Sequence, residues 1–131
     1  MSISIRHDPY EVAGKFRGIF AYGVETPAEA RMLNISGQVG VPAGGPTPAG
    51  FSDQCRIALN HIKNILAEAN MTFDDIVKMT FYLTRREDIP ALLDVRMEML
   101  NGVRPAVTTL LVAGLFEPDW LIEIDVVAAA S

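Results

Sequence analysis

The 131-residue sequence predicts an α+β domain in which two helices lie on one face of a single β-sheet. Two segments have helical periodicity, and the remaining apolar segments have the length and alternation of strands. Their order along the chain is strands, helix, strand, helix and two strands. No linker, low-complexity tail or internal repeat interrupts this order, so we expect one domain over residues 1–131.

The first third of the chain is strand-like. Residues 2–6 alternate between polar and apolar side chains, residues 19–22 form a second candidate strand, and residues 32–35 lead into a break at Ser36 and Gly37. Proline and glycine then accumulate up to position 50, and this composition predicts a loop.

The clearest pattern predicts a helix over residues 51–69. Apolar side chains recur at spacings of three and four, and the stripe that they form includes Cys55. Polar side chains are assigned to the opposite face of this helix: Gln54, Asn60, His61, Lys63 and Asn64. Asn70 is expected to end the helix in a left-handed conformation.

The second half of the chain predicts a strand over residues 76–84, a helix over 87–101 with Pro90 in its first turn, and strands over 106–113 and 120–129. Both faces of the last two strands are largely apolar, whereas an antiparallel sheet with one wet face alternates more cleanly. With only two helices, one face of the sheet is expected to be covered by another subunit. The sequence therefore predicts a closed homo-oligomer.

Composition excludes several classes of partner. The formal net charge is −5, which argues against a nucleic-acid surface because phosphate contacts need a clustered basic face. The longest uncharged run is broken by glycine and proline and cannot supply a membrane span. No secretory signal is visible, and the single cysteine fits a reducing compartment. We expect a cytoplasmic protein without nucleic-acid or membrane partners.

Glu123 is the first candidate for chemistry. It interrupts an apolar strand on the same face as Leu121, Asp125 and Val127. Burial there would favour the neutral acid and suit Glu123 to acid–base work. A paired structural carboxylate or a solvated strand face is the alternative.

Hydroxyl and guanidinium groups give weaker indications. Thr108 and Thr109 could orient the carboxylate or carbonyl of a ligand, although threonine is also a common strand residue. Arg96 falls within the apolar face of the second helix, where it must snorkel, pair with a carboxylate or meet a ligand. Arg104 could reach the same region or be a solvated loop residue. The two histidines lack metal-ligand spacing.

Four motifs occur in a familiar order along the chain. They are Ser36-Gly37-Gln38, the segment 74–84, Arg104-Pro105-Ala106 and the segment 121–125. Together they resemble the Rid family of reactive intermediate deaminases, formerly called the YjgF family and also described as endoribonuclease L-PSP. The similarity covers the chain from about Tyr22 onward.

The resemblance implies a homotrimer with a small-molecule cleft at each subunit boundary. It also implies a mixed sheet with the fold of trimeric chorismate mutase. The family's best-known activity is hydrolysis of enamines and imines such as 2-aminoacrylate to a 2-keto acid and ammonia, with no cofactor and no metal.

Carried onto this sequence, the resemblance makes Glu123 the residue that positions water or relays protons. It also implies six cleft-lining positions: Tyr22, Ser36, Gly37, Ala106, Val107 and Thr108. Deaminating members place an arginine where this chain has Val107, and that arginine pairs with the substrate carboxylate. The departure implies a divergent branch for which 2-aminoacrylate is not the expected substrate. Whether Arg96 or Arg104 supplies the cation instead stays open.

Three functions are compatible with these observations. The first is a Rid-like hydrolase acting on imines, enamines or related reactive metabolites. The alternative is a trimer that binds a small metabolite without turning it over, which the uncharged Val107 favours. The third, an endoribonuclease, is disfavoured by the acidic balance.

Overall fold

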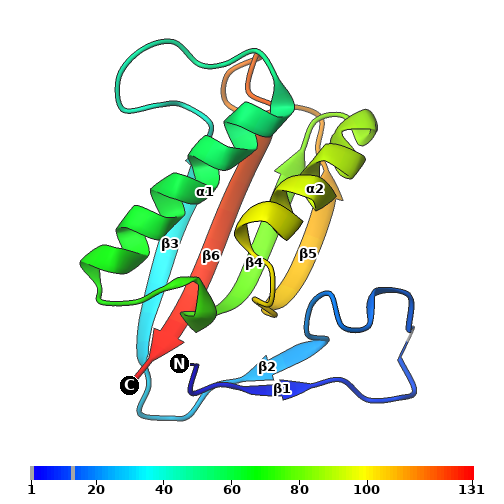
Figure 1. The fold of residues 1–131 in the computed structure, drawn as a ribbon, viewed down its shortest axis with the longest axis vertical. Coiled ribbons are helices and arrows are strands. Elements are labelled where there is room, and N and C mark those ends of the chain that lie inside the picture. Colours follow the sequence, from blue (N-terminus) through cyan, green and yellow to red (C-terminus); the bar gives the residue numbers. More distant parts are fainter. Residues whose placement is uncertain (1, 13) are drawn as a thin grey trace.

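The computed structural model describes residues 2–12 and 14–131. A four-stranded sheet forms one layer, and helices α1 and α2 cover one of its faces (Figure 1). In spatial order the strands are β3 (Arg31–Val39), β6 (Ile122–Ala130), β4 (Ile76–Leu83) and β5 (Ala106–Leu111). The predicted α+β fold is therefore confirmed.

The sheet is mixed, because β4 and β5 are parallel while β6 pairs antiparallel with both β3 and β4. A parallel pair requires a crossover, which α2 (Ile89–Met99) provides after a short 3₁₀ turn over Arg86–Asp88. Pro90 lies in the first turn of α2, as predicted. The helix is shorter than expected by two residues at each end.

The amino-terminal strands form a separate antiparallel ribbon from β1 (Ile5–His7) and β2 (Gly23–Glu25). The ribbon lies beyond one end of the main sheet in Figure 1. The prediction of a strand over residues 19–22 is wrong, because Phe20 and Ala21 make only isolated bridges. The Ala21 N–H donates to the Pro105 carbonyl (2.9 Å), so this segment lies against the start of β5.

Helix α1 (Phe51–Glu68) buries its apolar stripe against the sheet as predicted. The stripe contributes the fully buried side chains Cys55, Ala58, Leu59 and Ile62. Burial raises the pKa of the Cys55 thiol to about 12, so this cysteine is a packed apolar residue and not a nucleophile. Asn70, with φ of 56°, ends the helical segment in the left-handed conformation, as predicted.

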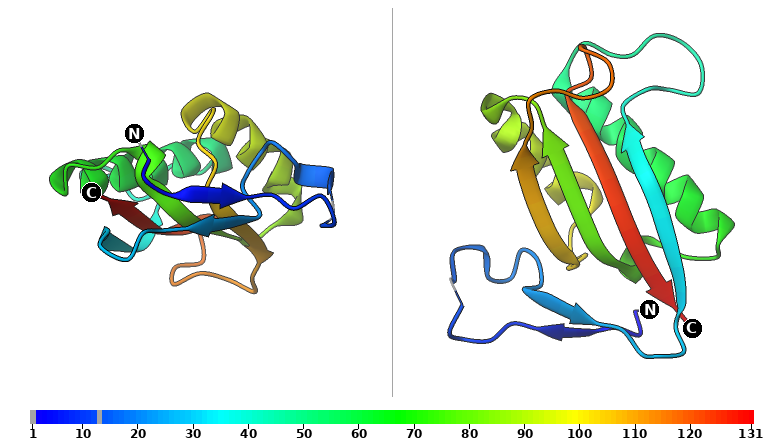
Figure 2. Two further views of the ribbon diagram at one scale, coloured as in Figure 1. Left: turned by 90° about the horizontal axis from the view of Figure 1, so that it is seen from below. Right: turned by 180° about the vertical axis from the view of Figure 1, so that it is seen from behind.

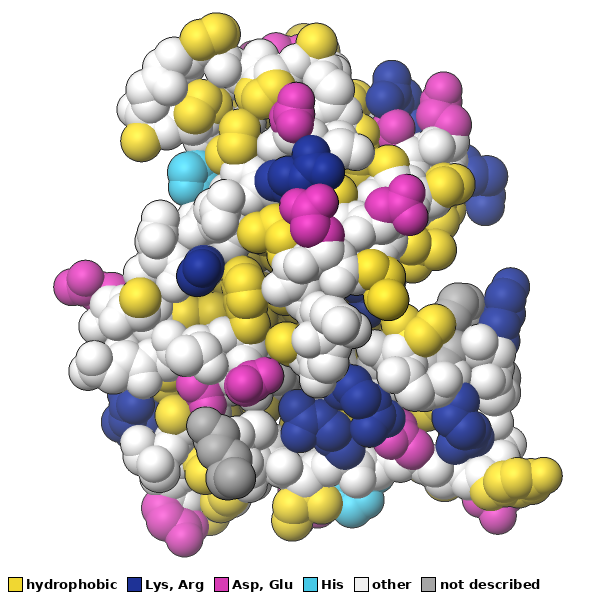
Figure 3. Space-filling model, viewed as in Figure 1, with side chains coloured by type: hydrophobic (Ala, Val, Ile, Leu, Met, Phe, Trp, Pro, Cys, Tyr) yellow, Lys and Arg dark blue, Asp and Glu magenta, His cyan; other side chains and the backbone are white. Residues whose placement is uncertain are grey.

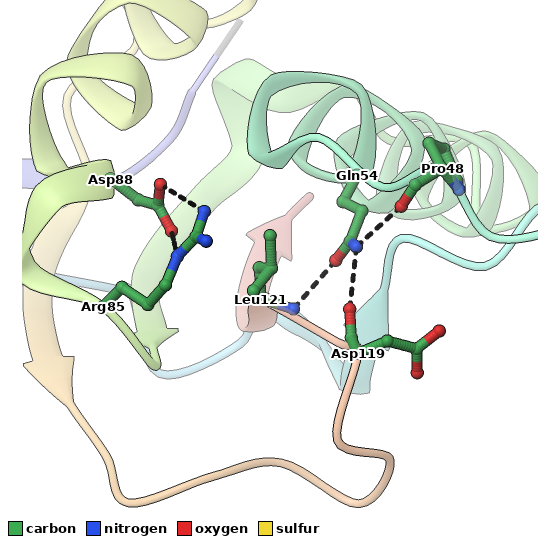
Figure 4. Close-up of polar contacts among 6 residues, drawn as sticks. All are labelled: Pro48, Gln54, Arg85, Asp88, Asp119 and Leu121. Atoms are coloured by element: carbon green, nitrogen blue, oxygen red, sulfur yellow. Dashed lines mark hydrogen bonds and ion pairs between the residues drawn. The ribbon is translucent and has the colours of Figure 1, made fainter.

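The assignment of Gln54 to the polar face of α1 is wrong, because this side chain is fully buried. Its Nε2 donates to the carbonyls of Pro48 (2.8 Å) and Asp119 (3.0 Å), and its Oε1 accepts from the Leu121 N–H (2.8 Å; Figure 4). Periodicity missed this role because the partners are loop backbone groups, one just before the helix at Pro48 and two far away in sequence at Asp119 and Leu121. Gln54 therefore ties α1 to the chain that enters β6.

The face of the sheet away from the helices is open (Figure 2, right). The expectation of a largely apolar second face is wrong for the centre of the sheet. Strand alternation places polar side chains there. They are Lys78, Thr80, Tyr82, Glu123 and Asp125, all of them half-buried or buried.

Candidate active site

A β-bulge shapes the open face next to Glu123. Ile35 pairs with Val126 and Gln38 pairs with Ile124, so that Ser36 and Gly37 together oppose a single residue of β6. A bulge of this kind redirects side chains and bends the strand. The Ser36-Gly37 break predicted from the sequence is therefore an irregularity within β3 and not its end.

Glu123 lies directly against Gly37. A Cβ atom at position 37 would overlap the Glu123 carboxylate, so only glycine leaves room for this side chain. Glu123 is half-buried, and within the described part of the chain its carboxylate has no hydrogen-bond or ion-pair partner. Its carboxylate is thus held against the sheet and free to accept a hydrogen bond from a ligand or water.

Asp125, two residues further along the same face, is already engaged. The Tyr82 hydroxyl donates to its Oδ2 at 2.9 Å, and Tyr82 is itself the strand partner of Glu123. This hydrogen bond, followed by burial and the negative charges of Asp125 and Glu123, raises the pKa of Tyr82. Tyr82 thus remains a neutral donor, and Glu123 is the carboxylate of the pair that is available for chemistry.

Two side chains of β4, Lys78 and Tyr82, were missed as site residues. The Lys78 Nζ donates to the Thr108 Oγ1 at 2.7 Å, so Lys78 holds the Thr108 hydroxyl and brings positive charge to the open face. The alternation of the 76–84 segment could have indicated both, since Lys78 and Tyr82 occupy positions of the face that also carries Thr80.

The predicted site residues of β5 divide between the two faces of the sheet. Ala106 and Thr108 share the open face with Lys78, while Val107 pairs with Met79 and packs against the core on the helix side. Adjacent strand residues point in opposite directions, so the three positions cannot line one surface.

Neither candidate arginine reaches the face that carries Glu123. The Arg96 guanidinium lies on the helix side, 5.2 Å from the centre of the Phe81 ring. Arg104 forms an ion pair with Asp8 of the amino-terminal segment. Within one chain, neither arginine lies beside Glu123.

Tyr22 lies near the first residue of β5. Its N–H donates to Asp8 Oδ1 at 2.9 Å, and the Arg17 guanidinium lies 5.4 Å from its ring centre. The neighbouring bridge between Ala21 and Ala106 places Tyr22 beside the start of β5.

The predicted site residues therefore form two groups in each chain. The carboxylate group contains Glu123, Gly37 and Ser36, and the β5 group contains Tyr22, Ala106, Val107 and Thr108. Glu123 is opposite Tyr82, whose β5 partner Leu110 is four residues beyond Ala106. Strand geometry then separates Glu123 from Ala106 by about 13 Å along the strands and about 10 Å across them. Thr108 is nearer to Glu123, about 7 Å along the strands and about 10 Å across them. A small ligand that contacts Glu123 within one chain therefore cannot also reach the start of β5 at Ala106.

No group of three or more His, Cys, Asp or Glu side chains among the described residues is arranged to hold a metal ion. None of the helices formed by these residues is long and apolar enough to cross a membrane.

The fold and the site define an α+β protein of chorismate-mutase-like fold, with a carboxylate on its open sheet face that has no partner among the described residues. A family model described as endoribonuclease L-PSP matches residues 19–130. TdcF of Escherichia coli, named for reactive intermediate deamination, is 30% identical over 118 residues, which cover 87% of this chain and 88% of TdcF. The chain belongs to the Rid family.

Other relatives agree with this membership. A 2-iminobutanoate/2-iminopropanoate deaminase from Capra hircus is 36% identical over 87 residues, 65% of this chain and 64% of the relative. The structure of the Rid family protein YyfB from Yersinia pestis matches with a TM-score of 0.84 at 23% identity, covering 97% and 98% of the two chains. E. coli TdcF with bound serine matches with a TM-score of 0.72 at 29% identity, covering 86% and 88%.

Proposed function

We propose that this protein is a Rid-type hydrolase that converts imines or enamines to carbonyl compounds and ammonia. The observation that carries the proposal is the half-buried Glu123 carboxylate, held against Gly37 without a partner of its own among the described residues. A carboxylate positioned in this way is suited to general base and acid catalysis.

In the proposed reaction, the oxygen of a water molecule bonds to the imine carbon while Glu123 accepts a proton from that water. The imine nitrogen takes a proton from solvent, and the adduct carries one hydroxyl and one amino group. An enamine enters the same route after its carbon gains a proton from solvent and its nitrogen loses one. Glu123 then returns its proton to the nitrogen as the carbon–nitrogen bond breaks. Ammonia leaves, the hydroxyl proton passes to solvent as the carbonyl group forms, and the carboxylate ends in its starting state.

The working unit is proposed to be a homotrimer with each cleft formed by two chains. The separation between Glu123 and the start of β5 supports this arrangement, because one small substrate can meet both Glu123 and Ala106 only across a subunit boundary. The proposed location is the cytoplasm.

The preferred substrate is proposed to be less anionic than a 2-imino acid. Val107 has no charge and packs against the core, so it supplies no counter-ion for a substrate carboxylate. The name of the goat deaminase and the serine bound to TdcF point to amino-acid-sized ligands in relatives. We therefore expect substrates of that size, with 2-aminoacrylate processed poorly.

Ammonia release from a panel of neutral imines and from enzymatically generated 2-aminoacrylate tests this function. Glu123→Gln should lower kcat by about 100-fold or more, since a positioned acid–base group contributes that much. Glu117→Gln, an exposed carboxylate outside the site, is the matched control and should keep wild-type turnover. An absence of acceleration across the panel, or full activity in Glu123→Gln, would contradict the proposal.

A trimer that binds a metabolite without turnover is the second candidate, favoured by the uncharged Val107. In that case a ligand that raises the melting temperature would be recovered unchanged after incubation. Endoribonuclease activity, the description of the matching family model, is disfavoured by the net charge of −5 and the carboxylates on the open face.

A further inference from the structure

A pocket of about 340 Å³ lies on the helix side of the molecule. It is bounded by the carboxyl-terminal half of α2, the segment that follows this helix, and the turn at Gly18 and Ile19. Figure 3 shows the molecule hollowed between α2 and the amino-terminal segment, with hydrophobic side chains along the α2 side. Small-molecule pockets span roughly 300–1,000 Å³, so the volume suits a compact metabolite.

The walls of the pocket are mainly apolar. Five apolar side chains contribute to them: Ile19, Leu93, Met97, Leu100 and Val103. Three of these keep much of their surface exposed, with 49% for Ile19, 46% for Leu93 and 66% for Met97. A ligand with an apolar chain would cover this surface and gain the corresponding transfer free energy.

Arg96 brings an uncompensated positive charge to this pocket. Its guanidinium rests on the buried Phe81 ring, at 5.2 Å, and has no hydrogen-bond or ion-pair partner within the described chain. Burial lowers the pKa of the Arg96 guanidinium, and no carboxylate in the described part of the chain opposes this effect. A guanidinium stays charged in proteins, so a partly buried charge of this kind is stabilised by an anion.

The second arginine of the pocket is already neutralised. Arg104 pairs with Asp8, which leaves Arg96 as the lining cation that lacks a counter-charge within the described residues. A single planar guanidinium matches one carboxylate through two parallel hydrogen bonds. A doubly charged phosphate would need a second cation, and Arg104, the other arginine that lines the pocket, is already paired with Asp8.

We propose that this pocket binds a small monocarboxylate with a short apolar chain, with the carboxylate on Arg96 and the chain against Leu93 and Met97. The inference concerns binding alone and stands whether or not the protein hydrolyses imines. Binding and turnover are measured separately, so failure of one proposal is distinguishable from failure of the other.

Pentanoate is the probe for the test, with pentan-1-ol and pentylamine as analogues that lack the negative charge. Titration into the full chain, followed by methyl NMR, should give saturable shifts for Leu93 and Met97 with pentanoate only. Arg96→Gln should weaken pentanoate binding about tenfold or more, because a charge-assisted bidentate contact is lost. Arg56→Gln, an arginine paired with Glu98 on the surface, is the matched control and should bind normally.

A second variant keeps Arg96 and fills the space. Met97→Trp changes an exposed side chain, so folding should be retained while pentanoate binding is lost. Glu123→Gln should still bind pentanoate. The proposal is overturned if pentanoate shifts do not saturate or if Arg96→Gln binds as wild type. It is also overturned if Arg96→Gln only reduces the mass of the assembly, since a partner chain's carboxylate would then occupy the pocket.

Discussion

Gly37 and Gly40 lie three residues apart, and neither position has room for a Cβ atom. At Gly37 the obstacle is the flexible end of the Glu123 side chain, whereas at Gly40 it is the backbone of α1 at Gln54. The first glycine thus leaves space for the candidate catalytic group, and the second allows a helix to approach the strand. Substitution of Gly37 should therefore affect mainly turnover, and substitution of Gly40 mainly stability.

Gly37→Ala should displace the Glu123 carboxylate and lower turnover about tenfold or more, with a change in the free energy of unfolding below about 1 kcal/mol. Gly40→Ala should instead destabilise the fold by about 2 kcal/mol or more, because helix backbone must move. Urea unfolding and imine turnover measure the two effects. In a Glu123→Gln background, Gly37→Ala should cause no further loss of turnover, and an additive loss would contradict the assigned contact.

At the scale of elements, Gln54 joins α1 to two loops through three hydrogen bonds to backbone groups. Gln54→Leu keeps the size of the side chain but leaves those groups without partners, so we expect a loss of about 2–4 kcal/mol in the free energy of unfolding. Asn60→Leu, an exposed position of the same helix, is the control and should stay within about 0.5 kcal/mol of wild type. Equal stabilities for the two variants would refute the role of Gln54.

The ribbon of β1 and β2 is attached through Asp8, which accepts from the Tyr22 N–H and pairs with Arg104. These contacts, the backbone hydrogen bond first, lower the pKa of Asp8. The folded state therefore binds fewer protons at this group than the unfolded state. The resulting stabilisation is fully present above the ordinary pKa of about 3.9 and is lost as the pH falls through the lowered value.

Hydrogen exchange of the Tyr22 amide should follow this pH dependence. We expect protection at pH 6 and its progressive loss below about pH 4, the ordinary range of an aspartate pKa. Asp8→Asn should remove most of the protection at both pH values, because the amide cannot pair with Arg104 as an anion. Protection that is unchanged in Asp8→Asn would show that the ribbon is held by other contacts.

Periodicity predicted both helices and the four main strands to within a few residues, because each has one face in a shared core. It failed where contacts distant in sequence decide the conformation. Residues 19–22 are apolar enough for a strand. Instead, Ala21 donates a hydrogen bond to the Pro105 carbonyl, and the segment makes only isolated β-bridges. Gln54 is of a residue type common on surfaces, yet it is buried and bonded to the Asp119 carbonyl and the Leu121 N–H, contacts that no local pattern reveals.

For the candidate site, the structure places Glu123 and Gly37, two of the residues singled out from the sequence, next to each other. It could not show that Val107 turns to the helix side while Thr108 faces the opposite way, since that depends on which strand β5 joins and in which register. Nor could it show that the site residues form two distant groups, because the order of strands is a property of the whole sheet.

At the scale of the whole molecule, the two groups predict complementation between inactive chains. Glu123→Gln lacks the carboxylate group, and a Tyr22→Ala, Thr108→Val double variant lacks the β5 group. If each cleft draws on two chains, refolding the two proteins together in equal amounts should restore about a quarter of wild-type turnover, the fraction of interfaces that combine both intact groups. Mixing that restores nothing would place both groups in one chain.

The position of β6 affects how the protein is made. This strand is the last one in the sequence, yet it lies between β3 and β4 at the centre of the sheet. During synthesis, β3 and the β4–α2–β5 unit emerge first and have no hydrogen-bonded contact until β6 arrives to join them. The same strand carries Glu123 and Asp125. A chain that halts before β6 therefore lacks a continuous four-stranded sheet and also lacks Glu123 and Asp125. The protein thus gains its fold and its candidate chemistry in one step.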